Sequence, residues 1–173
     1  MTNFTKLLML ISTLVLLIGG GVSFYLTYQG YQTVALTNAS EQGIAIDGFD
    51  AVAFHTEGSA QKGLEHYQVT WAGATWYFST FDNRQAFSGD PEKYAPQFGG
   101  YDSYGMAMNG ATHPATPELW TIEDAKLFLF HSGQTRKRWH ENSPDNLREA
   151  NINWTRIKQQ IQYKREMEKD TKP

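Results

Sequence analysis

Residues 67–78 form the stretch that decides the fold, and they read Tyr67-Gln-Val-Thr-Trp-Ala-Gly-Ala-Thr-Trp-Tyr-Phe78. Both ends of this stretch alternate with the two-residue period of a β-strand. Between them lies Gly73 with an alanine on each side, which is a turn signal. The stretch therefore predicts a β-hairpin, with Trp76 and Phe78 on one face and Tyr77 on the other.

A second hairpin is predicted further along the chain. Trp120-Thr-Ile122 and Lys126-Leu-Phe-Leu-Phe130 alternate in the same way and flank three residues that end in Ala125. An alanine makes a tight type I′ turn less favourable at this point, because such a turn prefers glycine. Short helices are expected around the hairpins, because capping residues and prolines stand at their starts. These expected starts are Asp50, Ser79, Asp90-Pro91, Ser132 and Ser143-Pro144.

The pattern as a whole predicts a single α+β domain, in which the two hairpins form one small antiparallel sheet covered by short helices. This domain is expected to span residues 43–155. Residues 30–42 are polar and are interpreted as a linker. Residues 156–173 carry both signs of charge and are interpreted as a helical tail.

The N-terminal segment, residues 1–29, is predicted to be an uncleaved transmembrane helix. Residues 7–28 contain no charged side chain, and a run of about 20 apolar residues is enough to cross a bilayer. Lys6 precedes the run and no basic residue follows before Lys62, so the N-terminus is expected in the cytoplasm. The rest of the chain then lies outside the cytoplasm, which is the periplasm in a bacterium. A cleaved signal peptide and a buried core helix are the alternatives.

Composition narrows the classes of function. The 173 residues include no cysteine, which excludes disulfides and thiolate metal sites in this chain. A net charge of −3 gives no electrostatic case for binding nucleic acid. The sequence also lacks a nucleophile elbow, a dinucleotide fingerprint and a phosphate-binding loop with its lysine. A non-enzymatic protein is therefore favoured.

Four motifs follow one another in an order known from one protein family. They are Gly48-Phe-Asp50, residues 71–78, Phe87-Ser-Gly-Asp-Pro-Glu-Lys-Tyr-Ala-Pro96 and Gly99-Gly-Tyr-Asp-Ser-Tyr104. This order resembles the YHS-domain proteins, specifically the branch of YHS domain-containing (seleno)proteins. The resemblance runs from about Ile44 to Trp154. YHS domains are associated with the handling of heavy metals, and the resemblance therefore implies a metal ion or small ligand as the bound species.

Asp102 departs from the family pattern, which usually has cysteine and sometimes selenocysteine at this position. A carboxylate carries out no redox chemistry and prefers harder cations than a thiolate does. Asp102 either replaces the thiol as a ligand or lies on a tyrosine-rich loop, solvated or accepting backbone N–H bonds. His113 is its best potential partner. The candidate ligand site is therefore Tyr101, Asp102, Tyr104 and His113, and a divalent metal ion is the cofactor considered for it.

Three classes of function stay open at this point. The leading interpretation is a membrane-tethered binding module for a metal ion or small ligand. The alternatives are an enzyme or redox accessory that has lost its reactive residue, and an interaction subunit whose C-terminal tail docks a membrane protein. His55, His66 and His140 are expected at the surface. The larger aromatics are interpreted as core, with an aromatic-lined pocket as the alternative; they are Trp71, Trp76, Tyr77, Phe78, Tyr94, Trp120, Phe128 and Trp139.

Overall fold

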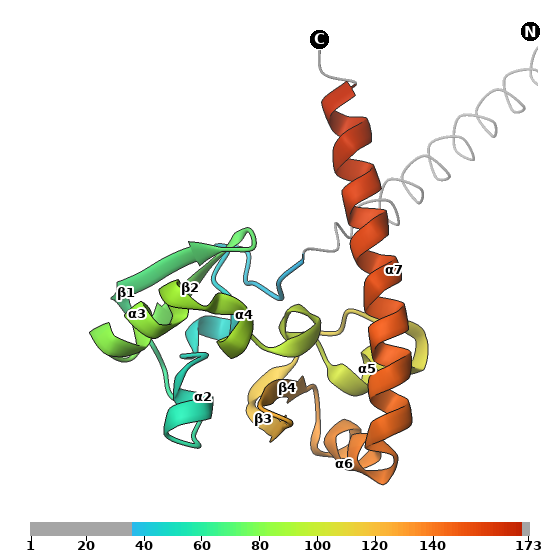
Figure 1. The fold of residues 1–173 in the computed structure, drawn as a ribbon, viewed down its shortest axis with the longest axis horizontal. Helices are drawn as coiled ribbons and strands as arrows, with labels where there is room; N and C mark the ends of the chain where they lie inside the picture. The colour runs from blue at the N-terminus through green and yellow to red at the C-terminus, as the bar shows by residue number, and fades with distance from the viewer. Residues whose placement is uncertain (1–35, 171–173) are drawn as a thin grey trace, which may run out of the picture. The chain divides into compact units, whose positions relative to one another are not determined.

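The structure is a computed structural model, and it describes residues 36–170 (Figure 1). These residues belong to one compact unit. The predicted transmembrane helix of residues 1–29 lies outside the described residues. Among the helices of residues 36–170, none is both long enough and apolar enough to cross a membrane.

The predicted α+β class and both hairpins are confirmed. Strand β1 (Leu64–Trp71) pairs antiparallel with β2 (Ala74–Phe78), and β3 (Thr116–Glu123) pairs antiparallel with β4 (Lys126–Phe130). The hairpins form two separate two-stranded sheets, so the prediction of one common sheet was wrong. The reason is that another segment of chain bridges the inner strand of each hairpin. Ile44 bridges to Thr75 of β2, and Asp102 bridges to Leu129 of β4.

Both hairpins close through two residues with positive φ. The values are 51° and 79° at Ala72 and Gly73, and 49° and 59° at Asp124 and Ala125. Positive φ at both positions matches the right-handed twist of the strands and is the mark of a tight turn. Ala125 therefore adopts the left-handed conformation that a tight type I′ turn requires. For a residue with a Cβ this conformation costs about 1–2 kcal/mol.

Helices precede, connect and follow the two hairpins, and all except the C-terminal helix are short. The α-helices are α2 (Ala53–Thr56), α3 (Phe81–Gly89), α4 (Pro91–Tyr94), α5 (Ser103–Asn109), α6 (Gly133–Glu141) and α7 (Ser143–Asp170), and the 3-10 helices are η1 (Ile46–Gly48) and η2 (Gln97–Gly100). The predicted helix starts at Asp90-Pro91 and Ser132 are confirmed, and the side chains of Asp90 and Ser132 act as N-caps. The cap of α3 is Thr80, one residue later than predicted, because Ser79 donates to a buried carboxylate instead.

The two halves of the described chain share one plan. β1, β2 and α3 have the same lengths as β3, β4 and α6, and each starts 52 positions before its counterpart. Residues 46–48 and residues 98–100, also 52 positions apart, each form a run of three positive φ angles. The bridges Phe49–Lys62 and Tyr101–Pro114 are related by the same offset. The fold therefore consists of two structurally similar halves, and the long helix α7 follows the second half.

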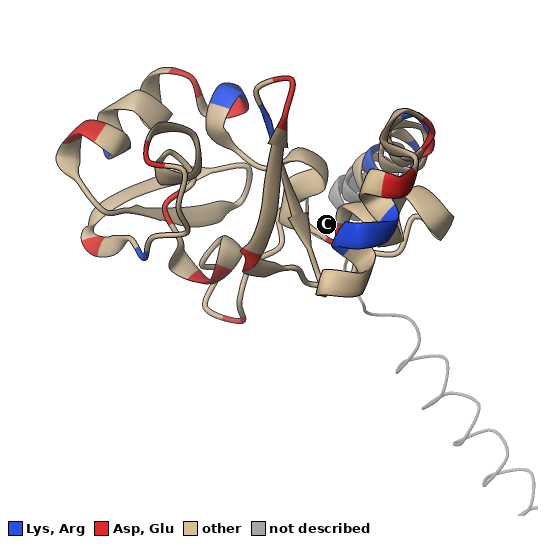
Figure 2. Cartoon of the chain, turned by 90° about the horizontal axis from the view of Figure 1, so that it is seen from below, with Lys and Arg blue, Asp and Glu red and all other residues tan. Residues whose placement is uncertain are grey.

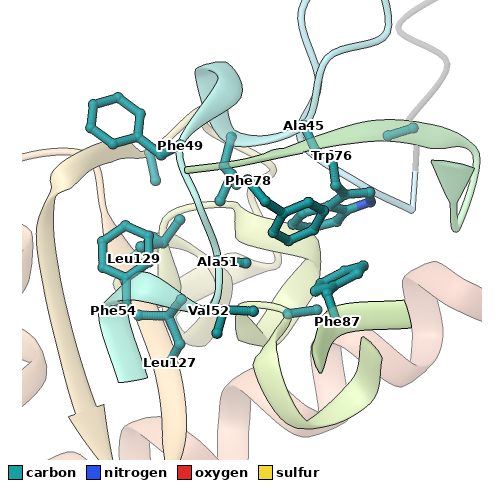
Figure 3. Close-up of a cluster of buried hydrophobic side chains, with 14 residues drawn as sticks. Ala45, Phe49, Ala51, Val52, Phe54, Trp76, Phe78, Phe87, Leu127 and Leu129 are labelled. Carbon is teal, nitrogen blue, oxygen red and sulfur yellow. The ribbon is translucent and has the colours of Figure 1, made fainter. Parts of the chain in front are cut away.

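Strand β4 joins the hydrophobic cores of the two halves. Its successive side chains point to opposite faces. Leu127 and Leu129 belong to the first core cluster, and Figure 3 shows them beside Phe54 of the first half. Phe128 and Phe130 belong to the second cluster. All four side chains are buried, so one strand is covered on both faces and holds the halves together.

Trp76 lies in the first core cluster, as predicted. It is 1% exposed, and its indole Nε1 donates to the Trp71 carbonyl at 3.0 Å. Trp76→Ala is expected to lower the free energy of unfolding by about 3–5 kcal/mol, since it removes a buried aromatic. Chemical denaturation of the full chain in detergent measures this loss. Tyr77→Ala, on the opposite face of the same strand, is the control, and equal losses for the two variants would contradict the assignment.

Candidate functional site

Asp102 is a buried helix cap. Asp102 is only 2% exposed, and its Oδ2 accepts a hydrogen bond from the Gly105 N–H at 3.0 Å. Its Oδ1 accepts from the N–H of His131, directly after β4, also at 3.0 Å. Of the two interpretations left open by the sequence, the geometry matches the one in which Asp102 accepts backbone N–H bonds. The loop expected around it is instead the start of α5, a helix that the sequence analysis missed.

Asp50 is the counterpart of Asp102 in the first half. It is fully buried, and its Oδ1 accepts from the N–H groups of Val52 and Ala53 at the start of α2. Its Oδ2 accepts from the N–H and hydroxyl of Ser79, directly after β2, and from the Asn83 amide. Each carboxylate therefore ties the end of a strand to the start of a helix. Asp50 does so with five donors and Asp102 with two.

The two tyrosines of the predicted site contact side chains of α6 and α7. The Tyr101 ring is buried against the indole of Trp154, with the ring centroids 6.3 Å apart. Tyr104 lies under the guanidinium of Arg138, 6.0 Å from the ring centroid. Both residues therefore make packing contacts within the second half.

His113 does lie close to Asp102, as predicted. The His113 carbonyl accepts from the Asp102 N–H at 2.9 Å. A Cβ placed on Gly105 would stand 3.0 Å from the Asp102 Oδ2 and 3.4 Å from the His113 ring. The His113 ring also lies 6.4 Å from that of His131. The structure thus brings one carboxylate and two imidazoles into one neighbourhood.

These groups do not form a metal centre among the described residues. In residues 36–170 no group of three His, Cys, Asp or Glu side chains is arranged to hold a metal ion. The His131 Nδ1 lies 2.9 Å from the Pro114 carbonyl and must carry a proton there, because a carbonyl can only accept. Both Asp102 oxygens already accept backbone N–H bonds. A divalent-metal site at Asp102 would therefore need ligands beyond those of the described chain.

A cavity of about 570 Å³ lies elsewhere, where the two halves meet. Four segments line it: residues 36–37, the tip of the first hairpin, residues 92–99 between α4 and η2, and one face of α7. Its volume falls within the range of small-molecule sites. The α7 face consists of Asn151, Trp154 and Lys158, whose spacing of three and four residues puts them on one side of the helix.

Indole rings dominate the apolar lining. Trp71 from the hairpin tip and Trp154 from α7 are half-buried, and Trp76 is buried behind them. Trp71 is held by edge-on contact with Phe87, with the centroids 5.8 Å apart. Gly99 permits the close approach of α7, because a Cβ there would stand 3.2 Å from the Trp154 ring and collide with the Leu36 carbonyl.

The cavity also carries one acidic and one basic side chain. Glu92 comes from α4 and Lys158 from α7, and both are exposed at the rim. Figure 2 shows the acidic and basic residues along α7. Neither Glu92 nor Lys158 forms an ion pair or side-chain hydrogen bond with any residue of the described chain. Two opposite charges therefore line an aromatic cavity without ion-pair partners among residues 36–170.

The sequence predicts Trp71 and Trp76 in the core, with an aromatic pocket as the alternative, and Lys158 in the helical tail. The spacing of Asn151, Trp154 and Lys158 was the available signal for one wall. No protein-family model, curated protein or solved structure matches this chain.

His55 was expected at the surface, but it is half-buried on α2. Its Nε2 is buried without a hydrogen-bond partner among the described residues, and its ring stands edge-on to Tyr94 at 5.5 Å. Burial lowers the pKa of the His55 imidazole below its ordinary value. A hydrogen bond with the Tyr94 backbone opposes this pKa shift, and the charge of Lys93 adds to it. His66 and His140 are exposed, as predicted.

The two buried aspartates should differ in their contribution to stability. Asp102→Ala leaves two backbone N–H groups without an acceptor, and we expect a loss of about 1–3 kcal/mol. Asp50→Ala leaves five donors unsatisfied, and we expect a loss above about 3 kcal/mol. Urea denaturation of the full chain measures both. An Asp102 variant as stable as the wild type would show that this carboxylate is not a structural acceptor.

His55 should make folding stability depend on pH. Because its folded pKa lies below the unfolded value of 6.5, the unfolded chain binds more protons, and stability falls as the pH drops below 6.5. Above that pH its contribution is fully present. His55→Gln should flatten this part of the profile of denaturation midpoint against pH, whereas His66→Gln, at an exposed position, should not. A His55→Gln profile as steep as that of the wild type would refute this assignment.

Proposed function

We propose that this chain is a membrane-tethered, extracytoplasmic binding module of the YHS type, and that it holds a small organic ligand in the cavity beside Trp154. The observation that carries this proposal is the cavity itself, about 570 Å³ in volume, with indole walls and unpaired polar groups at its rim. Apolar walls with a few convergent polar groups are the usual composition of a small-molecule site.

Two parts of the proposal, the membrane tether and the YHS type, are supported by the sequence alone. The charge-free run of residues 7–28 supports a tether, and the motif order from Gly48 to Tyr104 supports the YHS type. Binding rather than catalysis is supported by the lining of the cavity. Its one hydroxyl group, on Thr37, donates its hydrogen bond to the Ala72 carbonyl rather than to a side-chain base.

An interaction subunit is the second candidate function. Helix α7 exposes three large apolar side chains, with Ile152 57%, Tyr163 64% and Met167 49% exposed. Such side chains along one long helix support contact with a protein partner. The predicted partner of the C-terminal tail would then bind through α7, while the cavity would be free for a ligand.

A blocking substitution tests the binding function. Asn151→Trp places an indole in the cavity from an exposed helix position, whereas Ile152→Trp places one on the adjacent, outward position of the same helix. A library of small organic compounds is screened by thermal shift on the full chain in detergent. Compounds that raise the melting temperature of the wild type should act equally on Ile152→Trp and lose their effect on Asn151→Trp.

Two outcomes would refute this function. One is a screen that finds no stabilising compound for the wild type. The other is stabilisation of Asn151→Trp to the same extent as Ile152→Trp, since the compounds would then bind outside the cavity.

A further inference from the structure

The unpaired charges of the cavity restrict the chemistry of its ligand. We infer that the ligand is a zwitterion of about dipeptide size, whose cationic end lies at Glu92, whose anionic end lies at Lys158, and whose apolar body lies against the indoles. This inference rests on the proposed function of the cavity as a ligand site. It adds the class of compound that the site selects.

The two charges have no ion-pair partner among residues 36–170. Elsewhere on α7, Arg148 pairs with both Asp145 and Glu149. Lys158 has no acidic residue three or four positions away on the helix, so none can pair with it along α7. Glu92 likewise has no ion pair among the described residues. Both charges are therefore available to a ligand that enters the cavity.

Cations, anions and neutral ligands would each make fewer favourable interactions with the cavity lining than a zwitterion. A cation would gain from Glu92 and from the faces of the indoles, but Lys158 would repel it. An anion would pair with Lys158 and be repelled by Glu92. A neutral polyol could bond the amides of Asn151 and Gln97 and stack on the indoles, yet it would leave both charges without a partner. A zwitterion satisfies both charges and keeps an apolar body for Trp71 and Trp154.

The size of the cavity excludes the smallest zwitterions as full occupants. A volume of about 570 Å³ lies in the middle of the range found for drug-sized ligands. The two charges also come from different walls, Glu92 from α4 and Lys158 from α7. A ligand that pairs with both must therefore carry two opposite charges that reach two different walls, as a short peptide with free termini does.

A matched set of dipeptides tests the inference by isothermal titration calorimetry on the full chain in detergent. The probe is Phe-Leu with free termini, compared with its N-acetylated form, its C-terminal amide and the doubly blocked form. The free dipeptide should bind most tightly. Blocking either end should weaken binding about two- to fivefold, which is the effect of one exposed ion contact, and added salt should reduce the difference.

Substitutions assign each end of the ligand to one residue. In Glu92→Gln, N-acetylation should no longer weaken binding, whereas amidation should. In Lys158→Met, amidation should no longer weaken binding, whereas N-acetylation should. Lys164→Met, at an exposed position on the same helix, is the control and should behave like the wild type.

The outcomes separate this inference from the proposed function. Equal binding of the free and the doubly blocked dipeptide overturns the inference, as does an identical pattern of affinities in Glu92→Gln, Lys158→Met and wild type. If no dipeptide binds while neutral compounds stabilise the wild type but not Asn151→Trp, the inference fails and the binding function stands. If nothing binds in the cavity, both fail.

Discussion

A carboxylate buried between the end of a strand and the start of a helix organises each half of this fold. Asp50 joins β2 to α2, and Asp102 joins β4 to α5. A hydrogen bond to a charged acceptor contributes about 1.5–3 kcal/mol, more than a neutral one. The carboxylates also satisfy helix N–H groups that would otherwise be buried without partners. The position of each helix against the end of its hairpin therefore depends on one side chain.

The cavity is a consequence of joining two such halves. Strand β4 is buried on both faces and locks the second hairpin into the core of the first half. The segment between the halves, which includes Gly99, then forms one side of the cavity, and α7 closes it from the end of the second half. Because every wall comes from a different part of the chain, the cavity exists only when both halves are folded and docked.

Local signals in the sequence were sufficient for the hairpins and most helix starts. Alternation placed Trp76 and Phe78 on the buried face, and cap chemistry placed the starts of α4 and α6. The similarity of the two halves was not visible in the sequence, because identity between the halves is confined to a few positions. Among these are Gly48 and Gly100, Asp50 and Asp102, and Phe78 and Phe130. They are the positions where positive φ, the buried acceptor and the core ring are physically required.

The cavity beside Trp154 could not be predicted from the sequence as well as the fold could, and the reason is physical. The resemblance to the YHS family points to position 102, because the family pattern usually has a reactive thiol there. In this chain that position holds a carboxylate that both strand and helix need as an acceptor, and a thiol is only a weak acceptor. A carboxylate has no thiol chemistry and accepts the N–H groups at the end of β4 more strongly than a thiol would. The cavity between Trp71, Glu92 and Lys158 shares no side chain with Asp102, so a ligand bound there would not depend on this position.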